Sequence, residues 1–353
     1  MGVKNLSKIL KKFCPQVIKR TTIGDYSNKI IGIDASIFFY KFVYVSNKYD
    51  KPNHYLQMFL QQIMTMKTHN ITPIYVFDGV APKAKESEQL KRSESRIQRK
   101  DDIASQRVKI TQMRQQLPVF KQDVRKYSDL RQEIRDLETK VKNKEDAIIH
   151  VTPKHTNNLK GLLTILSIPY IQGNGETDPL TAQLCKDGLF DYVMSEDMDY
   201  LPLATPKLIR TERTPYTGAY VEKCNLEYDY ADVLTGLGLD TSQFTDLCIL
   251  CGCDYVDQLY KIGPLTAYKL IKEHRSVENV LQNIDHEKHK VPDNYLELVT
   301  NARNCFGKKY THKITKDMLC TRTPNIEKFE HFMNTFCTIS PGDKKTYTDL
   351  ISK

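Results

Sequence analysis

The stretch Pro73-Ile74-Tyr75-Val76-Phe77-Asp78-Gly79 decides the fold, because it is a short apolar run that ends in an acidic residue. Ile30-Ile31-Gly32-Ile33-Asp34 has the same form. Apolar runs of this length, bounded by turn residues, are typical of buried strands. Residues 168–171 and Tyr192–Met194 are two further strand candidates.

Helical patterns separate these strand candidates. Residues 37–45 and 180–186 suit helices, and the chain turns mostly helical from Tyr230 onward. Strand–helix alternation is typical of a largely parallel sheet flanked by helices. The predicted fold class is therefore α/β, with residues 1–82 and 161–353 supplying the sheet and its helices.

The stretch 83–160 differs from the rest of the chain. It is dense in charged residues and glutamine and poor in glycine. Leu130, Ile134, Leu137 and Val141 recur at helical spacing, so we predict an inserted pair of helices that breaks at Pro118. A charged helix is most often a solvated surface. This one, however, follows directly after Asp78.

Composition favours a polyanionic partner inside the cell. The chain carries 52 Lys and Arg against 43 Asp and Glu, a net charge of +9, which suits nucleic acid. No apolar run approaches the roughly 18 residues that span a membrane, and the N-terminus has no secretory pattern.

The 9 cysteines are expected to be reduced thiols. Cys248, Cys251 and Cys253 are expected to be buried rather than zinc-bound, because no second pair accompanies them.

Carboxylates follow every strand candidate. Open parallel sheets bind their ligands at the carboxyl ends of the strands, so these side chains are expected to meet at one edge. The predicted group consists of Asp34, Asp78, Glu176, Asp178, Asp197, Asp199 and, after an apolar helix, Asp254.

Such a group needs positive charge. Two like charges ~4 Å apart repel by about 4 kcal/mol at an effective dielectric constant of about 20. Protons or cations must therefore neutralise them, and oxygen-only ligands suit Mg²⁺. Two such ions suit the attack of water on a phosphodiester. Taken singly, Asp34 and Asp178 also suit helix N-caps, Asp78 a turn, and Asp197 and Asp199 the surface. Their joint placement favours the metal site.

Several motifs, in order, resemble the flap endonuclease branch of the 5′-nuclease superfamily, which includes the XPG repair nucleases. The resemblance covers nearly the whole chain. Its motifs are Met1-Gly2-Val3 with Leu6, Ile33-Asp34-Ala35-Ser36 with Tyr40, Tyr75-Val76-Phe77-Asp78-Gly79, Lys91-Arg92-Ser93-Glu94, Ser195-Glu196-Asp197-Met198-Asp199, Asp246-Leu247-Cys248-Ile249-Leu250, Gly252-Cys253-Asp254-Tyr255 and Ile262-Gly263-Pro264.

The resemblance implies a PIN-like fold, a helical arch over residues 83–160 and a helix–two-turn–helix at about 245–275. It implies two Mg²⁺ ions, which Mn²⁺ can replace. Asp34, Asp78 and Glu176 would hold the first ion, Asp178 would lie between the two, and Asp197, Asp199 and Asp254 would hold the second.

The resemblance also implies roles for residues outside the acidic set. Lys85 and Arg92 match a basic pair at the base of the arch that stabilises transition-state charge. Tyr40 matches a tyrosine that stacks on the base next to the cut, although an ordinary core aromatic is the alternative. Gly2 matches a glycine near the site that requires removal of Met1.

The remaining DNA-binding residues implied by the resemblance lie on the arch and in the helix–two-turn–helix. Lys91 and Arg96 belong to the arch. The second group would grip duplex phosphates through backbone N–H groups, with a K⁺ in the turn, unless this is a plain helix-capping turn. It consists of Lys261, Ile262, Gly263 and Thr266.

The predicted function is therefore a magnesium-dependent 5′ flap endonuclease in DNA replication, repair or recombination. It would act as a monomer on branched or nicked DNA with a 5′ single-stranded flap, leaving a 5′-phosphate and a 3′-hydroxyl. The alternatives are a 5′→3′ double-strand exonuclease or junction resolvase of the same superfamily, and a non-catalytic branched-DNA-binding protein. The full acidic set argues against the last of these.

The chain departs from the family pattern at several points. Glu176-Thr177-Asp178-Pro179 stands where flap endonucleases have Glu-Ala-Glu-Ala, and Lys261-Ile262-Gly263 replaces Gly-Ile-Gly. Gly252-Cys253-Asp254-Tyr255 looks more like the exonuclease branch, and the arch is longer than usual. No Gln-x-x-Leu-x-x-Phe-Phe pattern occurs at the C-terminal end, so a sliding-clamp partner is not expected.

Overall fold

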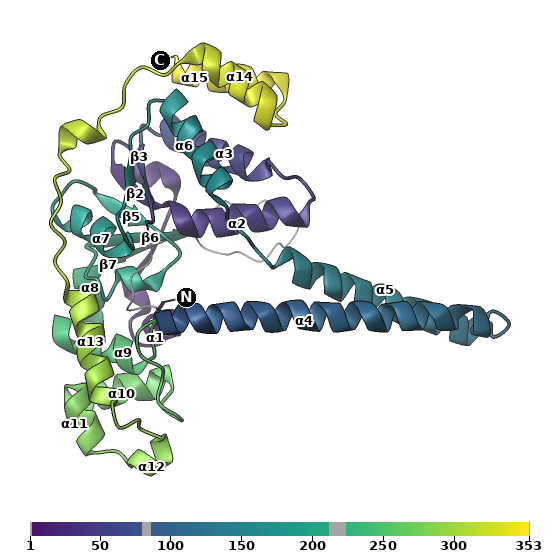
Figure 1. The fold of residues 1–353 in the computed structure, drawn as a ribbon. Coiled ribbons are helices and arrows are strands. Elements are labelled where there is room, and N and C mark those ends of the chain that lie inside the picture. Colours follow the sequence, from purple (N-terminus) through teal and green to yellow (C-terminus); the bar gives the residue numbers. More distant parts are fainter. Residues whose placement is uncertain (1, 80–85, 212–223, 353) are drawn as a thin grey trace.

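The computed structural model describes residues 2–79, 86–211 and 224–352, without the side chains of residues 86–89, 91 and 92. A sheet with helices on both faces forms the body, and a long helical hairpin projects from it (Figure 1).

The sheet has seven strands in the order β1-β7-β6-β5-β2-β3-β4. The five strands from β6 to β4 run parallel, and β7 and β1 add an antiparallel edge. The strands are β1 Ile18–Thr21, β2 Ile30–Asp34, β3 Thr72–Phe77, β4 Tyr170–Gln172, β5 Tyr192–Met194, β6 Lys207–Thr211 and β7 Asn225–Asp229.

The mostly parallel α/β fold predicted from the sequence is confirmed. All four strand candidates form strands, although β4 begins at Tyr170 rather than at residue 168. Strands β1, β6 and β7 were not predicted. They mix apolar with charged or polar residues, as in Ile18-Lys19-Arg20-Thr21, so they lack the continuous apolar run that marks a buried central strand.

Alternate side chains of each central strand enter two separate cores. Ile74 and Val76 of β3 pack on one face, whereas Tyr75 and Phe77 pack on the other. Gly32 of β2 leaves room for a neighbouring ring, since a Cβ there would lie 2.4 Å from the Phe190 side chain. The apolar strands are thus buried on both faces, as parallel strands usually are.

Helices cover both faces. Five of them pack on the face of Tyr75 and Phe77: α2 Ala35–Lys48, α3 His54–Thr68, α6 Pro153–Ile165, α14 Ile326–Phe336 and α15 Pro341–Ile351. The core on the other face includes α1 Leu6–Phe13, α7 Asp178–Lys186, α8 Tyr230–Leu237, α9 Thr241–Leu250, α10 Pro264–His274, α11 Val277–Gln282 and α13 Tyr295–Gly307. The short α12 His286–His289 lies near α11 at one end of the molecule (Figure 1).

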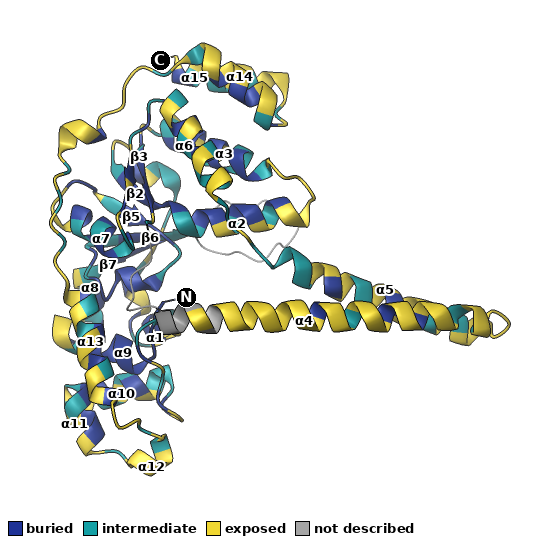
Figure 2. Ribbon diagram, in the orientation of Figure 1, coloured by how far each residue is buried: buried dark blue, intermediate teal, exposed yellow. Residues whose placement is uncertain are grey.

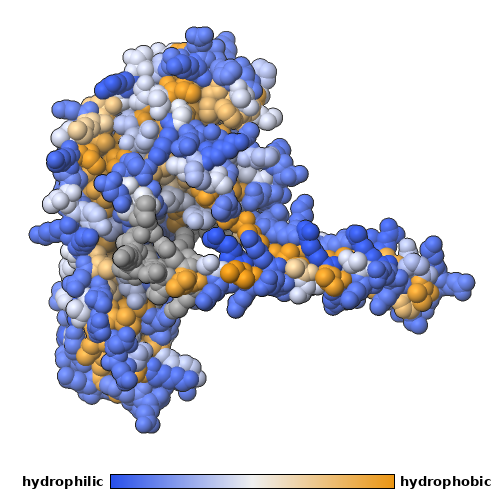
Figure 3. All heavy atoms as spheres, viewed as in Figure 1, coloured by the Kyte–Doolittle hydropathy of each residue, from blue (hydrophilic) through white to orange (hydrophobic). Residues whose placement is uncertain are grey.

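The projecting hairpin consists of α4 Glu86–Gln116 and α5 Val124–Asp146, joined through a 3₁₀ turn at Leu117–Phe120. At about 1.5 Å per residue, α4 is about 46 Å long. A seam of buried apolar side chains runs between the two helices of the hairpin, while the outer surface of the hairpin is exposed (Figures 2 and 3). The seam contains Ile103, Ile110, Met113, Ile134 and Val141.

Three cross-helix ion pairs flank this seam. They join Lys144 to Asp102, Arg107 to Glu145 and Arg114 to Glu138, each at 2.6 Å. The hairpin therefore has a core of its own, separate from the two cores of the body.

Neither a membrane span nor a disulfide is found in the part of the chain that the structure describes. Over that part, no helix is long and apolar enough to cross a bilayer. The nine cysteines are free thiols, and Cys248, Cys251 and Cys253 are buried, as predicted.

Candidate active site

Asp34 stands where β2 turns into α2 and is 6% exposed. One carboxylate oxygen caps the helix by accepting from the Ile37 N–H at 3.3 Å. The other accepts from the Ser195 hydroxyl, which follows the adjacent strand β5, at 2.8 Å. The capping role considered for Asp34 is therefore real, and its second oxygen still points to the neighbouring strand end.

Asp78 follows β3 and lies close to the start of α7. Its oxygens accept hydrogen bonds from the Ser36 hydroxyl and, at 3.0 Å, from the Thr177 N–H. The Gly79 N–H donates to the Gly175 carbonyl at 2.8 Å, which ties residues 173–175 to the end of β3.

Thr177, rather than Asp178, is the N-cap of α7. Asp178 lies in the first helical turn and accepts from the Tyr200 hydroxyl at 2.8 Å.

Asp197 and Asp199 follow β5 and lie against the N-terminal residues. Asp197 caps a 3₁₀ turn by accepting from the Asp199 N–H at 3.0 Å. Asp199 is buried and accepts from the Val3 N–H. Asp254 accepts from the Gly2 N–H at 3.2 Å. Two residues of the N-terminus therefore connect the acids after β5 with the acid after α9.

Gly2 is fixed by this environment. Its φ is +76°, and a Cβ would lie 2.0 Å from an oxygen of Asp197 and 2.5 Å from one of Asp199. A larger residue would displace both carboxylates, so only glycine fits here. The prediction that Gly2 lies beside the acidic residues is in accord with this geometry.

All seven predicted acids gather at one edge of the sheet, which we call the carboxylate edge. Burial and then the charge of Asp78 raise the pKa of Asp34 to about 7. Burial, followed by the charges of Asp34 and Asp197, raises the pKa of Asp178 well above its ordinary value. Glu176 contributes to the same shift. Desolvation of each carboxylate by burial, reinforced by repulsion from the neighbouring acids, explains why both pKa values rise.

The carboxylate edge fits divalent cations by its chemistry. The hydrogen bonds described above for Asp34, Asp78 and Asp178 come from hydroxyl and N–H groups, which carry no net charge. Among residues 2–79, 86–211 and 224–352, no three acidic, histidine or cysteine side chains stand as a ready cage around one ion. Small side-chain movements would therefore accompany binding. Hard oxygen donors under mutual repulsion are suited to Mg²⁺ or Mn²⁺.

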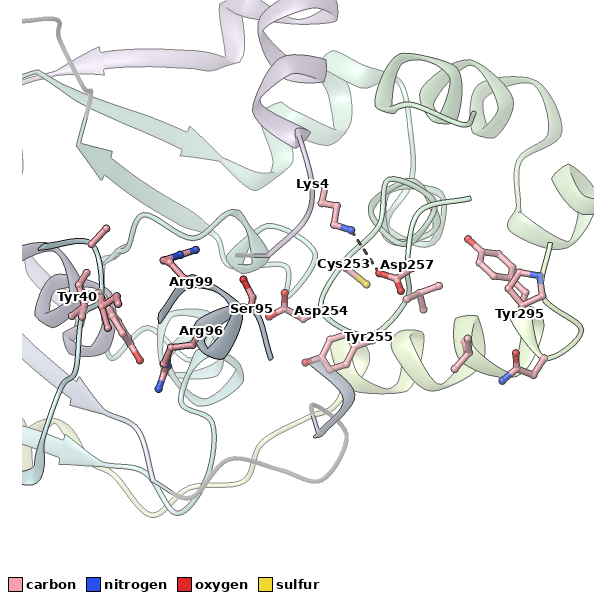
Figure 4. A pocket seen from close by; sticks show the side chains of 17 residues that line it. Lys4, Tyr40, Ser95, Arg96, Arg99, Cys253, Asp254, Tyr255, Asp257 and Tyr295 are labelled. Carbon is pink, nitrogen blue, oxygen red and sulfur yellow. Dashed lines mark ion pairs between the residues drawn. The ribbon is translucent and has the colours of Figure 1, made fainter. Parts of the chain in front are cut away.

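A cavity of about 700 Å³ adjoins the carboxylate edge (Figure 4). Arg96 and Arg99 of α4 and Tyr40 of α2 line it together with Asp254 and Tyr255. Tyr40 is 42% exposed, so it is not an ordinary core aromatic. The cavity thus brings two guanidinium groups and an accessible aromatic ring into one space with Asp254, an acid of the carboxylate edge.

The predicted basic residues at the start of the arch have no described side chains. Lys85 lies outside the described residues, and Lys91 and Arg92 lie on α4 with side chains that are not described. Their roles remain predictions.

The predicted duplex-binding turn precedes α10. Gly263 is the N-cap, and Pro264 occupies the first turn. The first turn of a helix leaves N–H groups without intrahelical acceptors, here those of Leu265 and Thr266. The side chain of Thr266 is exposed. Ile262 differs from the expectation, because its side chain is fully buried and its N–H donates to the Leu259 carbonyl at 3.1 Å.

Sequence reasoning missed several residues of the site. Ser36, Ser195 and Tyr200 hold the carboxylates, and Arg99 lines the cavity. Ser36 and Ser195 belong to recognisable motifs, which was a usable signal. Arg99 lies three residues after Arg96, so helical spacing could have placed both on one face. Nothing local pointed to Tyr200.

Comparison with known proteins establishes the family. Residues 1–99 match the XPG N-terminal domain, and residues 167–254 match the XPG I-region. Flap endonuclease 1 of Ostreococcus lucimarinus is 33% identical over 342 residues, which cover 94% of this chain and 80% of that protein. The chain belongs to the flap endonuclease family. The resemblance inferred from its motifs is thereby confirmed.

Solved structures share the fold of this flap endonuclease. The catalytic core of Rad2 in complex with DNA substrate matches with a TM-score of 0.67 and 17% identity over 100% of both chains. Flap endonuclease-1 from Methanococcus jannaschii matches with a TM-score of 0.63 and 19% identity, over 99% of this chain and 98% of that one. At these identities the likeness shows the fold alone.

Proposed function

We propose that the chain is a structure-specific 5′ nuclease that hydrolyses DNA at the junction between a 5′ flap and a duplex. The gathering of seven acids from separate elements at one sheet edge carries the proposal, because like charges that repel one another at close range are stabilised by bound cations. Family membership supports the same activity.

Two Mg²⁺ ions would supply an activated water and would stabilise charge on the leaving oxygen. Asp34, Asp78 and Glu176 would hold one ion, and Asp197, Asp199 and Asp254 the other, with Asp178 between them. Ser36, Ser195 and Tyr200 orient their carboxylates through the hydrogen bonds described above. Such second-layer partners typically change metal affinity or activity by about 10- to 100-fold.

The remaining residues would bind and position the DNA. Arg96 and Arg99 face the cavity from the arch and would attract phosphates. Tyr40 is exposed enough to stack on a base, an interaction worth about 1–3 kcal/mol. Lys85 and Arg92 would stabilise transition-state charge, and Lys91 would contact the strand. The start of α10 would hold duplex phosphates, with a K⁺ ion in the same turn.

End-labelled DNA tests the activity directly. The purified protein is incubated with a 5′-flap substrate, a nicked duplex, a blunt duplex and a four-way junction in Mg²⁺, in Mn²⁺ and in chelator. We expect metal-dependent cleavage of the flap substrate within one or two nucleotides of the junction, leaving a 5′-phosphate. Preference for the blunt duplex or the four-way junction would instead indicate an exonuclease or a resolvase.

A single ligand substitution separates catalysis from binding. Asp197→Asn should lower the cleavage rate by about 1,000-fold, equivalent to about 4 kcal/mol, and leave flap binding largely intact. Asp349→Asn, an exposed acid on α15, is the matched control and should cleave normally. Unchanged cleavage by Asp197→Asn would mean that the reaction does not depend on this carboxylate, and absence of cleavage by the wild type would indicate a protein that only binds branched DNA.

With this activity, the protein would act at sites of DNA replication, repair or recombination inside the cell. Its partner would be branched or nicked DNA, bound by a single copy of the chain. Size-exclusion chromatography with light scattering, with and without flap DNA, measures that stoichiometry.

A further inference from the structure

Four lysines lie close together in the segment that leads from α13 towards α14. No aspartate or glutamate occurs among residues 308–316, and the lysines of this stretch are Lys308, Lys309, Lys313 and Lys316. All four side chains are exposed. The segment runs along the outside of the body, on the side away from the projecting hairpin (Figure 1). We call residues 308–316 the basic strap.

Alternate side chains of the strap face in opposite directions. Lys308 and Thr315 have extended backbone angles, and in an extended chain successive side chains point to opposite sides. Tyr310, His312 and Ile314 are half-buried, and Ile314 packs against the core that includes α7 and α13. Lys309 and Lys313 therefore point outward on the same side, about 13 Å apart at about 3.3 Å per residue.

Two contacts place the strap at the edge of the sheet opposite the carboxylate edge. Nε2 of the His312 ring lies 2.9 Å from an oxygen of Asp187, which directly follows α7. Asp178, at the carboxylate edge, begins the same helix, whose nine residues span about 14 Å. Beyond the strap, the Arg322 N–H donates at 3.3 Å to the carbonyl of Ser167, which precedes β4. The strap thus lies at the amino-terminal ends of the parallel strands.

The charge of the strap is not compensated by neighbouring acids. In the described part of the chain, no carboxylate forms an ion pair with any of its four lysines. Asp187 is held by His312, and Asp317 follows the strap directly. Ammonium groups gathered on one short segment repel one another, and a bound polyanion would relieve that repulsion.

The surroundings of the lysines favour a phosphate backbone over a protein surface. Protein interfaces are typically poor in lysine and centre on buried apolar or aromatic side chains. The outward face of the strap instead combines lysines with the exposed hydroxyls of Thr311 and Thr315, and both kinds of group are typical phosphate contacts. Met318 is exposed in the 3₁₀ turn that follows, but one apolar side chain does not form an interface core.

We propose that the basic strap binds the sugar–phosphate backbone of a second DNA segment, so that one copy of the protein holds two DNA segments on opposite edges of its sheet. The proposed function is needed only for the segment at the carboxylate edge, because no reacting atom lies at the strap. Binding at the strap would be independent of base sequence and would weaken as salt is added.

Capture of a free duplex on immobilised flap DNA tests the strap. Beads that carry 5′-flap DNA are saturated with protein in chelator, and a short fluorescent duplex without a flap is added. The wild type should retain this duplex. Lys309→Gln/Lys313→Gln should bind it about tenfold more weakly near physiological salt, and the slope of log K against log salt should fall by about 2. The affinity for flap DNA and the cleavage rate should not change.

Two matched variants exclude general effects of charge and stability. Lys328→Gln/Lys345→Gln removes the same charge from exposed positions on α14 and α15 and should capture the duplex like the wild type. Lys309→Arg/Lys313→Arg keeps the charge of the strap and should also capture it. Because all these positions are exposed, every variant should melt at the wild-type temperature. Equal capture by the wild type and by Lys309→Gln/Lys313→Gln would overturn the proposal.

A photo-cross-linker at Thr311 identifies what the strap contacts. With p-benzoylphenylalanine at this exposed position, light should join the strap to the free duplex. Cross-linking to the bead-bound flap DNA would mean that the strap grips the substrate itself, and the second segment would be ruled out. Binding of an oligoglutamate peptide without cross-linking to the duplex would indicate an acidic protein partner and would also overturn the proposal. If the wild type captures the duplex but cuts no flap DNA, the proposed function fails and the strap inference stands.

Discussion

Two acidic clusters in this chain differ in how their negative charge is compensated. At the carboxylate edge, hydroxyl and N–H groups hold the buried acids, and the pKa of Asp34 is raised to about 7. Around Arg303, one guanidinium bonds both Asp246, at 2.6 and 2.7 Å, and Glu278, at 2.6 and 2.9 Å. Hydrogen bonding from Arg303 lowers the pKa of Glu278 to about 2.

The difference shows what each cluster does. Asp246 is 1% exposed and also accepts from the Val277 N–H, so the Arg303 cluster joins α9, α11 and α13. It carries its own cation and serves the fold. The carboxylate edge leaves its positive charge to be supplied by bound ions, and so it can serve chemistry.

Neutralising an acid at the carboxylate edge should remove activity without cost to the fold. Asp178→Asn keeps an oxygen for the Tyr200 hydroxyl but removes a charge that its neighbours oppose. We expect cleavage of flap DNA to fall by about 1,000-fold or more while the melting temperature in chelator rises. A melting temperature below that of the wild type would mean that Asp178 serves folding, and the contrast between the clusters would be lost.

Removing the cation from the other cluster should do the reverse. Arg303→Met leaves Asp246 buried without its guanidinium, which should lower the free energy of unfolding by about 3 kcal/mol. Urea denaturation measures this loss, and Arg322→Met, an exposed arginine, serves as the control. Cleavage per folded molecule should remain near the wild-type rate at low temperature. A stable Arg303→Met protein would contradict the assigned role.

The two clusters should also give opposite pH dependences. Because the folded pKa of Asp34 lies above its ordinary 3.8, the folded state retains the proton longer. Stability in chelator should therefore fall as the pH rises from about 4 to about 7, by at most about 1.4 kcal/mol per pH unit for one proton.

The folded pKa of Glu278 lies below its ordinary 4.5, so its contribution is present above pH 4.5 and is lost as the pH falls towards about 2. Thermal melts of Asp34→Asn and Glu278→Gln across pH 2–8 separate the two windows. Asp34→Asn should remove the pH dependence of stability only between about pH 4 and about pH 7, and Glu278→Gln only below pH 4.5. In the wild type, Mg²⁺ should remove the pH dependence between about pH 4 and about pH 7.

Exposed ion pairs of the hairpin should matter least. Arg114 and Glu138 lie 2.6 Å apart, as close as the contacts of Arg303, but water surrounds them. Glu138→Gln should change the free energy of unfolding by about 0.5 kcal/mol or less. A loss as large as that of Arg303→Met would show that burial is not what separates these sites.

Much of the fold and most of the acidic set could be predicted, because both depend on local patterns. The apolar runs 30–33 and 73–77 mark strands buried on two faces, and Asp34 and Asp78 stand at their ends. Parallel strands bring their carboxyl ends to one edge of the sheet, so an acid that directly follows a strand can be placed at that edge from the sequence. The mixed strands β1, β6 and β7 carried no such pattern and were missed.

Sequence alone determined the family, the parallel core and the identity of the acids. Tertiary structure decided which groups surround those acids. The Gly2 N–H meets Asp254, 252 positions away, and Arg303 meets Asp246 across 57 positions. Lys290 reaches the ring of Tyr260 only because the turn before α10 folds against the end of α12. Local patterns record burial and periodicity, whereas charge compensation depends on distances that only the folded chain fixes.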